Sequence, residues 1–136
     1  MCVAVLSERT IGGEDQRPIN QQVQENRMLT PKEIECLRAC NECATACLQC
    51  ATACLREEDV KPMARCIALD YECADICCLA ATSIASGSTQ LDAVCALCAS
   101  ACDACASECD KHAMDHCRHC AEACKRCADA CRSVAK

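Results

Sequence analysis

Aromatic residues are almost absent from this chain of 136 residues, which contains no Trp, no Phe and a single Tyr. Aromatic packing therefore cannot build its core. Glycine and proline are also scarce, with three of each, which excludes a knottin or a metallothionein-like chain of turns. A chain of this length is nevertheless long enough to bury a core of its own as one domain.

Basic residues are fewer than acidic ones, with 14 Lys and Arg and 20 Asp and Glu, so the net charge is −6. Non-specific binding of nucleic acid needs a basic surface, so we expect no nucleic-acid partner. No run approaches the roughly 20 apolar residues that span a bilayer, so we expect no membrane association. Residues 1–6 lack the basic flank and the cleavage site of a secretory signal. We therefore predict a cytoplasmic protein with reduced thiols.

Sulfur is what the chain has in excess, with 21 cysteines, a share far above ordinary usage. The odd count excludes complete internal disulfide pairing.

Residues 1–29 contain only one of these cysteines, together with two glycines, one proline and a polar stretch. We interpret residues 1–29 as an N-terminal tail, in which residues 18–28 can form a short helix. Residues 30–136 then form the cysteine-rich domain.

The cysteine-rich domain begins with a strong helix-start signal. Thr30 stands where an N-cap is expected, Pro31 follows at the first helical position, and Glu33 completes a capping box. The helix that begins here is expected to run to about residue 56, where an acidic turn follows.

Three further helices are expected over about residues 60–86, 88–111 and 115–134. Gly87 suits a left-handed cap at the end of the second helix, and Ser88 or Thr89 can cap the third. Short connections make neighbouring helices antiparallel. The sequence therefore predicts an all-α fold, an antiparallel up-down-up-down four-helix bundle with a Cys-lined core.

The cysteines recur at spacings of three and four residues, which is the a/d pattern of a bundle helix. Sulfur thus occupies positions where Leu and Ile normally fill a core, and the second helix also places Met63 and Asp70 on this seam. The candidate metal-ligating cysteines are Cys36, Cys40, Cys43, Cys47, Cys50, Cys54, Cys66, Cys73, Cys77, Cys78, Cys95, Cys98, Cys102, Cys105, Cys109, Cys117, Cys120, Cys124, Cys127 and Cys131. Of these, Cys78 lies one position off the seam.

Thiolates are soft ligands that select Cu(I), Zn(II) and iron–sulfur clusters. Zinc takes four ligands, so these 20 cysteines would hold only about five separate ions. Cu(I) accepts two or three thiolates that can bridge ions, which allows on the order of 20 Cu(I) ions at about one per thiolate. We predict a non-enzymatic Cu(I) store, because no base or oxyanion device accompanies any cysteine.

Two alternatives remain open at this point, an iron–sulfur electron-transfer protein and a zinc or heavy-metal thiolate buffer. The absence of the ferredoxin pattern Cys-x2-Cys-x2-Cys-x3-Cys-Pro weighs against the iron–sulfur alternative.

A core of disulfides is also disfavoured, because cysteines four residues apart on one helix have poor geometry for the bond.

The antiparallel arrangement also sorts residues between the two ends of the bundle. One end gathers Cys54, Met63, Cys66, Asp70, Cys109, His112, His116 and Cys117, and the other gathers Cys36, Ile84, Leu91, Val94 and Val134. We predict that the first end admits copper, with Met63, Asp70, His112 and His116 among the ligands. Asp70 is expected to pair with His112 or His116 in the metal-free protein, and Glu108 is expected to face outward.

The cysteine runs over residues 36–54 and 95–109, and the segment His-Cys-Arg-His-Cys-Ala-Glu-Ala-Cys over 116–124, resemble those of four-helix-bundle copper storage proteins. The resemblance is to their cytosolic branch, which lacks a signal peptide, and it covers about residues 31–134. It implies a homotetramer of bundles whose cores hold many Cu(I) ions, and a copper chaperone is a candidate donor. Asp70 departs from an all-Cys core.

Overall fold

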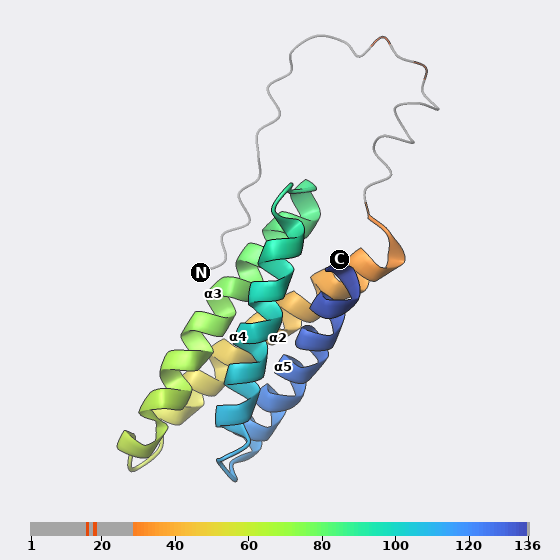
Figure 1. The fold of residues 1–136 in the computed structure, drawn as a ribbon. Coiled ribbons are helices and arrows are strands. Elements are labelled where there is room, and N and C mark those ends of the chain that lie inside the picture. Colours follow the sequence, from red (N-terminus) through yellow and green to blue (C-terminus); the bar gives the residue numbers. More distant parts are fainter. Residues whose placement is uncertain (1–15, 17, 19–28, 136) are drawn as a thin grey trace.

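The computed structural model describes residues 16, 18 and 29–135, and four long α-helices dominate it (Figure 1). The elements are α2 Pro31–Leu55, the short 3₁₀ helix η1 Lys61–Met63, α3 Ala64–Ser86, α4 Leu91–Cys109 and α5 Asp115–Val134. The predicted all-α class is confirmed, and within the described ranges there is no strand. No described helix is both long and apolar enough to cross a membrane. The short helix expected over residues 18–28 falls outside the described residues, apart from Pro18.

The four helices form a closed ring around a shared axis. Helix α2 packs against α3 and α5, and α4 packs against the same two helices from the other side. The α2–α3 and α4–α5 connections lie at one end of the bundle, and the α3–α4 connection lies at the other (Figure 1). This is the predicted antiparallel four-helix bundle.

Two local signals in the sequence act as predicted at helix ends. The Glu33 amide donates to Thr30 Oγ1 at 3.2 Å, and the Thr30 amide donates to Glu33 Oε1 at 3.3 Å, which completes the capping box. At the end of α3, Gly87 has φ of 64°, the left-handed region that only glycine enters without a steric penalty.

The expected cap of α4 is wrong. The N-cap of α4 is Gln90, and its side chain makes no capping hydrogen bond. The Ser88 hydroxyl instead accepts a hydrogen bond from the Gln90 amide at 3.0 Å, in the turn that precedes the helix. Serine forms such local turns as readily as it caps a helix, so the sequence pattern suits both uses.

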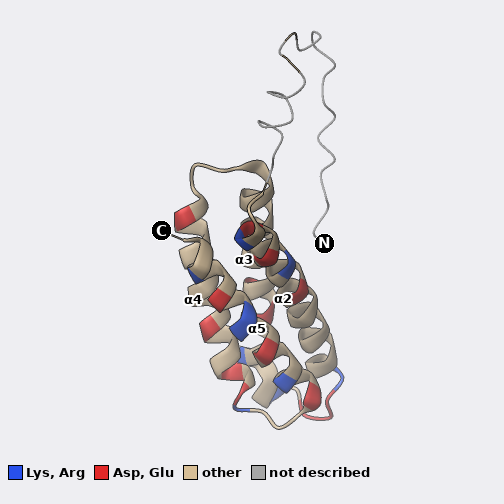
Figure 2. Cartoon of the chain, turned by 90° about the vertical axis from the view of Figure 1, so that its right-hand side faces the viewer, with Lys and Arg blue, Asp and Glu red and all other residues tan. Residues whose placement is uncertain are grey.

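The interior of the bundle consists mainly of cysteine and alanine, and Ile84 is the largest side chain that is fully buried. Leu91, Val94 and Val134 pack against this core near Ile84, at the end that carries the α3–α4 connection. Figure 2 shows charged residues of both signs distributed along the helices. The apolar residues that the sequence places together at one end therefore close that end of the bundle.

We expect the reduced, metal-free protein to be helical and to unfold cooperatively, because Ala and Cys thiols pack without metal. Ile84→Ala should lower its free energy of unfolding by about 2–5 kcal/mol, since the deletion leaves a cavity. Leu79→Ala is the matched control on the same helix, because Leu79 is 48% exposed. Circular dichroism during urea unfolding measures both effects. A coil-like spectrum of the metal-free protein would contradict this expectation.

Candidate metal-binding core

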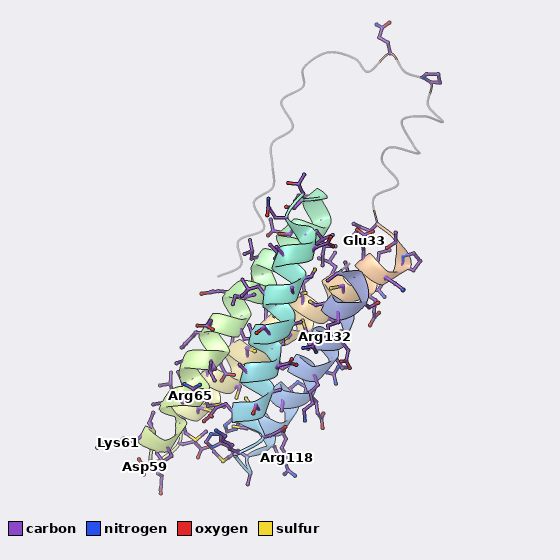
Figure 3. The ribbon with its side chains drawn as sticks, in the orientation of Figure 1. Glu33, Asp59, Lys61, Arg65, Arg118 and Arg132 are labelled. Carbon is purple, nitrogen blue, oxygen red and sulfur yellow. The ribbon has the colours of Figure 1, made fainter. Side chains whose placement is uncertain are left out.

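The cysteines of the four helices converge on the bundle axis. Nineteen of them are buried free thiols, and these are all the cysteines predicted for the core except Cys78. Cys78 is half-buried on α3 and packs against this cluster from its edge. Figure 3 shows the sulfur atoms lying between the helices. The heptad pattern thus predicted the composition of the core correctly.

Neighbouring thiols in this array are close both along and between helices. Along α2, the Sγ atoms of Cys43 and Cys47 are 4.0 Å apart, because residues four apart share one helix face. Between helices, Cys43 Sγ lies 3.6 Å from Cys124 Sγ of α5 and 3.9 Å from Cys73 Sγ of α3. The sulfurs therefore form a continuous column rather than isolated pairs.

Several groups of four cysteines could each hold a metal ion. Each group has its Sγ atoms within 4.8 Å of one another, and examples are Cys43/Cys47/Cys73/Cys124, Cys43/Cys73/Cys77/Cys102 and Cys47/Cys105/Cys120/Cys124. These groups share members, since Cys43, Cys47, Cys73 and Cys124 each belong to two of them. Because one thiolate serves adjacent groups, the arrangement suits ions joined by bridging sulfurs better than separate tetrahedral sites.

Burial keeps the end thiols protonated in the absence of metal. Loss of solvent raises the pKa of Cys54 and of Cys95 to about 11. Where thiols are packed most closely they share protons unequally. Hydrogen bonding with Cys109, whose Sγ lies 3.6 Å away, lowers the pKa of Cys66, while the pKa of Cys109 is raised. A cation that binds these thiols must therefore displace protons.

Asp70 is fully buried within the thiol array. Its Oδ1 atom accepts hydrogen bonds from Cys105 at 3.2 Å and from Cys120 at 3.3 Å. Two longer thiol contacts, both 3.8 Å, come from Cys66 and Cys109. Loss of solvent, reinforced by the negative charge of nearby thiolates, raises the pKa of Asp70 to about 8.

The expected pairing of Asp70 with His112 or His116 is wrong. Asp70 occupies a seam position, and its carboxyl contacts cysteines of the facing helices α4 and α5. The two histidines lie in or next to the α4–α5 connection, and each has a glutamate nearby instead.

Glu108 was expected to face outward and is instead only 6% exposed. Its carboxylate accepts a hydrogen bond from Lys111 Nζ at 3.1 Å, lies 3.4 Å from His112 Nε2 and lies 3.8 Å from Arg65 Nε. Burial alone would raise the pKa of Glu108, but the hydrogen bonds from Lys111 and His112 bring the pKa below its ordinary value. The cysteine spacing does not predict the burial of Glu108, because Glu108 is next to the seam residue Cys109 and is not itself a seam position.

We call the end that carries the α2–α3 and α4–α5 connections the mouth. Met63 is 3% exposed there, beside the buried group Cys50, Cys54, Cys66 and Cys117. His116 Nε2 is buried without a hydrogen-bond partner and lies 3.7 Å from Glu57 Oε1. Figure 3 labels Lys61 and Arg118, which mark the polar surface around this end. The structure therefore brings Met63 and His116 to the same end of the bundle as this group of cysteines.

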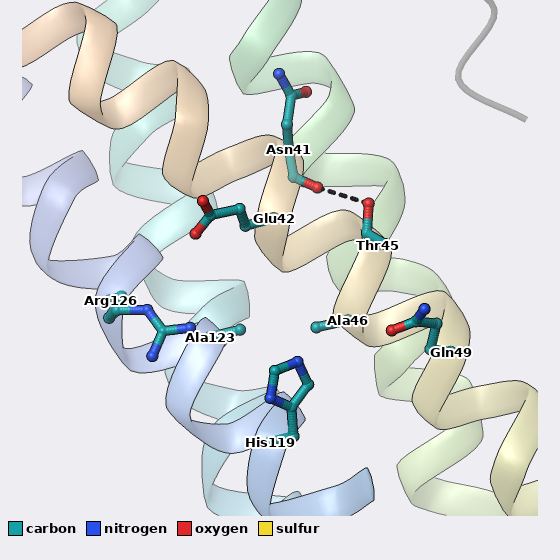
Figure 4. A pocket seen from close by; sticks show the side chains of 8 residues that line it. All are labelled: Asn41, Glu42, Thr45, Ala46, Gln49, His119, Ala123 and Arg126. Carbon is teal, nitrogen blue, oxygen red and sulfur yellow. Dashed lines mark hydrogen bonds between the residues drawn. The ribbon is translucent and has the colours of Figure 1, made fainter.

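His119 takes no part in the mouth. It is exposed on α5 and lines a groove between α2 and α5 with Gln49, Ala123 and Arg126 (Figure 4). The floor of the groove is formed by the small side chains of Ala46 and Ala123, and the thiol column lies on the opposite side of these helices.

A bundle whose core is a column of shared thiols defines a protein that holds clusters of soft metal ions. Residues 30–136 match the copper storage protein family over their full length, and the chain belongs to this family. The match begins at the capping-box threonine and includes every core cysteine.

Solved structures of copper storage proteins agree with this assignment, and a curated relative shares the abundance of cysteine. The chain is similar to the apo form of copper storage protein 3 from Bacillus subtilis, with 48% identity, 74% of this chain and 96% of that one covered, and a TM-score of 0.71. It is also similar to the Streptomyces lividans copper storage protein loaded with 10 copper equivalents, at 34% identity, 85% and 96% coverage and a TM-score of 0.76. The cysteine-rich protein YhjQ of Bacillus subtilis is 49% identical over 67 residues, which span 48% of this chain and 55% of that relative.

The buried carboxyl of Asp70 should make stability depend on pH. Because the folded-state pKa of about 8 lies above the ordinary value of about 3.9, the folded state binds this proton more tightly. The free energy of unfolding of the metal-free protein should then fall between about pH 4 and pH 8, by up to about 1.4 kcal/mol per pH unit. Asp70→Asn keeps the shape of the side chain and should remove this slope, while the thiol contributions stay common to both proteins. Urea unfolding at a series of pH values measures it, and equal slopes in both proteins would refute it.

Proposed function

We propose that this protein stores Cu(I) in the cytoplasm by binding many ions through its core cysteines. The observation that carries the proposal is the sharing of thiols such as Cys43 and Cys124 between adjacent groups of four. Bridging thiolates hold monovalent metal ions close together. The negative charge of each thiolate cancels the positive charge of an ion, and a buried site requires such neutrality. Membership of the copper storage protein family supports the same function.

The capacity should approach one Cu(I) per core thiolate. Each thiolate carries one negative charge and each Cu(I) one positive charge, so a dry core favours a ratio near one. With nineteen buried free thiols, this gives on the order of 20 ions per chain. The proposed core ligands are the cysteines of the four helices.

Copper should reach the core through the mouth. Ile84 and its apolar neighbours close the opposite end, whereas the mouth offers Met63, His112 and His116 as soft or borderline ligands. Asp70 lies just inside, where its carboxyl can exchange protons with the thiols or hydrogen-bond to remaining thiols. Carboxylate oxygen is a hard donor, so we assign Asp70 to proton transfer first and to direct binding only as a weak ligand.

The remaining proposals concern the molecule as a whole. We propose a non-enzymatic protein that assembles as a homotetramer, receives Cu(I) from a copper chaperone and acts without nucleic acid or membrane. One of the similar proteins is a cytosolic copper storage protein from Streptomyces lividans, which supports the cytoplasmic assignment.

Anaerobic titration of the reduced protein with Cu(I), followed by metal analysis, tests the capacity. We expect saturation at about 20 ions per chain, with absorption confined to the ultraviolet. The same titration with Zn(II) is the comparison, since four-coordinate sites would saturate near about five ions. Saturation with Cu(I) near five ions, or a purified protein with the visible absorption of iron–sulfur clusters, would contradict the proposal.

Substitutions at the mouth test the route. Asp70→Ala and His116→Ala should each slow Cu(I) uptake or chelator-driven removal by about tenfold or more, because each removes a group at the path to the core. Total capacity should stay within a few ions, since the cysteines remain. His119→Ala is the matched control, because His119 lies on the same helix and outside the mouth. Stopped-flow traces that match the unchanged protein in both mouth variants would show that copper enters elsewhere.

A further inference from the structure

The buried carboxylate of Glu108 lies beside one mouth histidine in a constrained geometry. Glu108 is in the last turn of α4, and His112 follows four residues later in the connection to α5. Glu108 Oε1 is 3.4 Å from His112 Nε2, and the His112 side chain is only 14% exposed. The contact therefore reaches across the end of the helix and ties the first residues of the connection to α4.

Two cationic side chains hold Glu108 in place. Lys111 Nζ lies 3.1 Å from Glu108 Oε2, and Arg65 Nε of α3 lies 3.8 Å from the same oxygen. Both bind Oε2, which leaves Oε1 to His112. A buried carboxylate without such partners would be strongly destabilising, so these contacts fix the position of the oxygen that faces the imidazole.

We propose that Glu108 is a positioning residue that keeps the His112 proton on Nε2 and so leaves Nδ1 as the free donor for Cu(I). A neutral imidazole carries one proton, and the partner of one ring nitrogen decides which nitrogen is free to bind a metal. The inference rests on the proposed function, because it assumes that His112 receives copper at the mouth. It assigns a role to a residue that does not itself contact the ion.

His116 provides a contrast within the same mouth. Its Nε2 atom is 3.7 Å from Glu57 Oε1, beyond hydrogen-bond distance, and the Glu57 side chain is 37% exposed against 8% for Glu108. No second cation holds Glu57 in the part of the chain that the structure describes. The two histidines therefore differ in how firmly a carboxylate fixes their protons, and Glu57 is a matched control for Glu108.

Nitrogen-15 NMR of the reduced, metal-free protein tests the positioning directly. The histidine ring nitrogens report the tautomer at a pH above the ordinary histidine pKa of about 6.5. We expect His112 to be almost entirely the Nε2–H tautomer in the unchanged protein and a mixture in Glu108→Ala. Glu108→Gln should restore the Nε2–H tautomer, because its amide oxygen still accepts the proton. Glu57→Ala should leave the His112 signals unchanged.

Copper binding at His112 provides the second readout. The His112 signals are followed while a Cu(I) chelator removes metal from the loaded protein. In Glu108→Ala the affinity of this position should fall by about 10- to 100-fold, the usual effect of removing a carboxylate behind a ligating histidine. Glu57→Ala should release copper from His112 at the same chelator concentration as the unchanged protein.

The outcomes separate the inference from the function on which it rests. A His112 tautomer that is the same in the unchanged protein and in Glu108→Ala would overturn the positioning role, whatever copper does. A His112 signal that fails to respond to Cu(I) in the unchanged protein, while the core still loads, would overturn the assignment of His112 to the copper path. Circular dichroism of each variant verifies that the bundle is intact.

Discussion

The contact between sulfur atoms across the bundle axis is the constraint on which the rest of the structure depends. A cysteine side chain is short, so four helices can bring thiols within 3.6 to 4.0 Å of one another only if their backbones approach closely. Buried alanines such as Ala39, Ala74 and Ala121 make this approach possible. An ordinary core of Leu and Ile would hold the helices too far apart for shared thiol groups.

The two buried carboxyl groups, of Asp70 and Glu108, have pKa values shifted in opposite directions by their surroundings. Asp70 lies among thiols, which are weak donors, so loss of solvent dominates and its pKa rises to about 8. Burial alone would raise the pKa of Glu108, but the contacts with Lys111 and His112 bring it below the ordinary value. One carboxyl can therefore exchange protons with the core at neutral pH, while the other remains a fixed negative charge at the mouth.

The two ends of the bundle differ in chemistry, since one is apolar and the other is polar. Ile84, Leu91 and Val134 cover one end with apolar surface that offers no ligand. At the mouth, His112 and His116 lie between the thiols and the charged connections, each beside a glutamate. The antiparallel topology produces this polarity, because it places the α2–α3 and α4–α5 connections together.

The sequence by itself determined the four helices, the capping box at Thr30, the left-handed cap at Gly87 and the cysteine core, because these depend on local signals and on helical periodicity. Only the tertiary structure decided that Asp70 is bound by thiols and that Glu108 turns inward to His112. Periodicity states which residues share a helix face, but partners across the bundle depend on how neighbouring helices are rotated and where each one ends. Residues of the mouth lie where the helical period stops, so packing between elements alone sets their contacts.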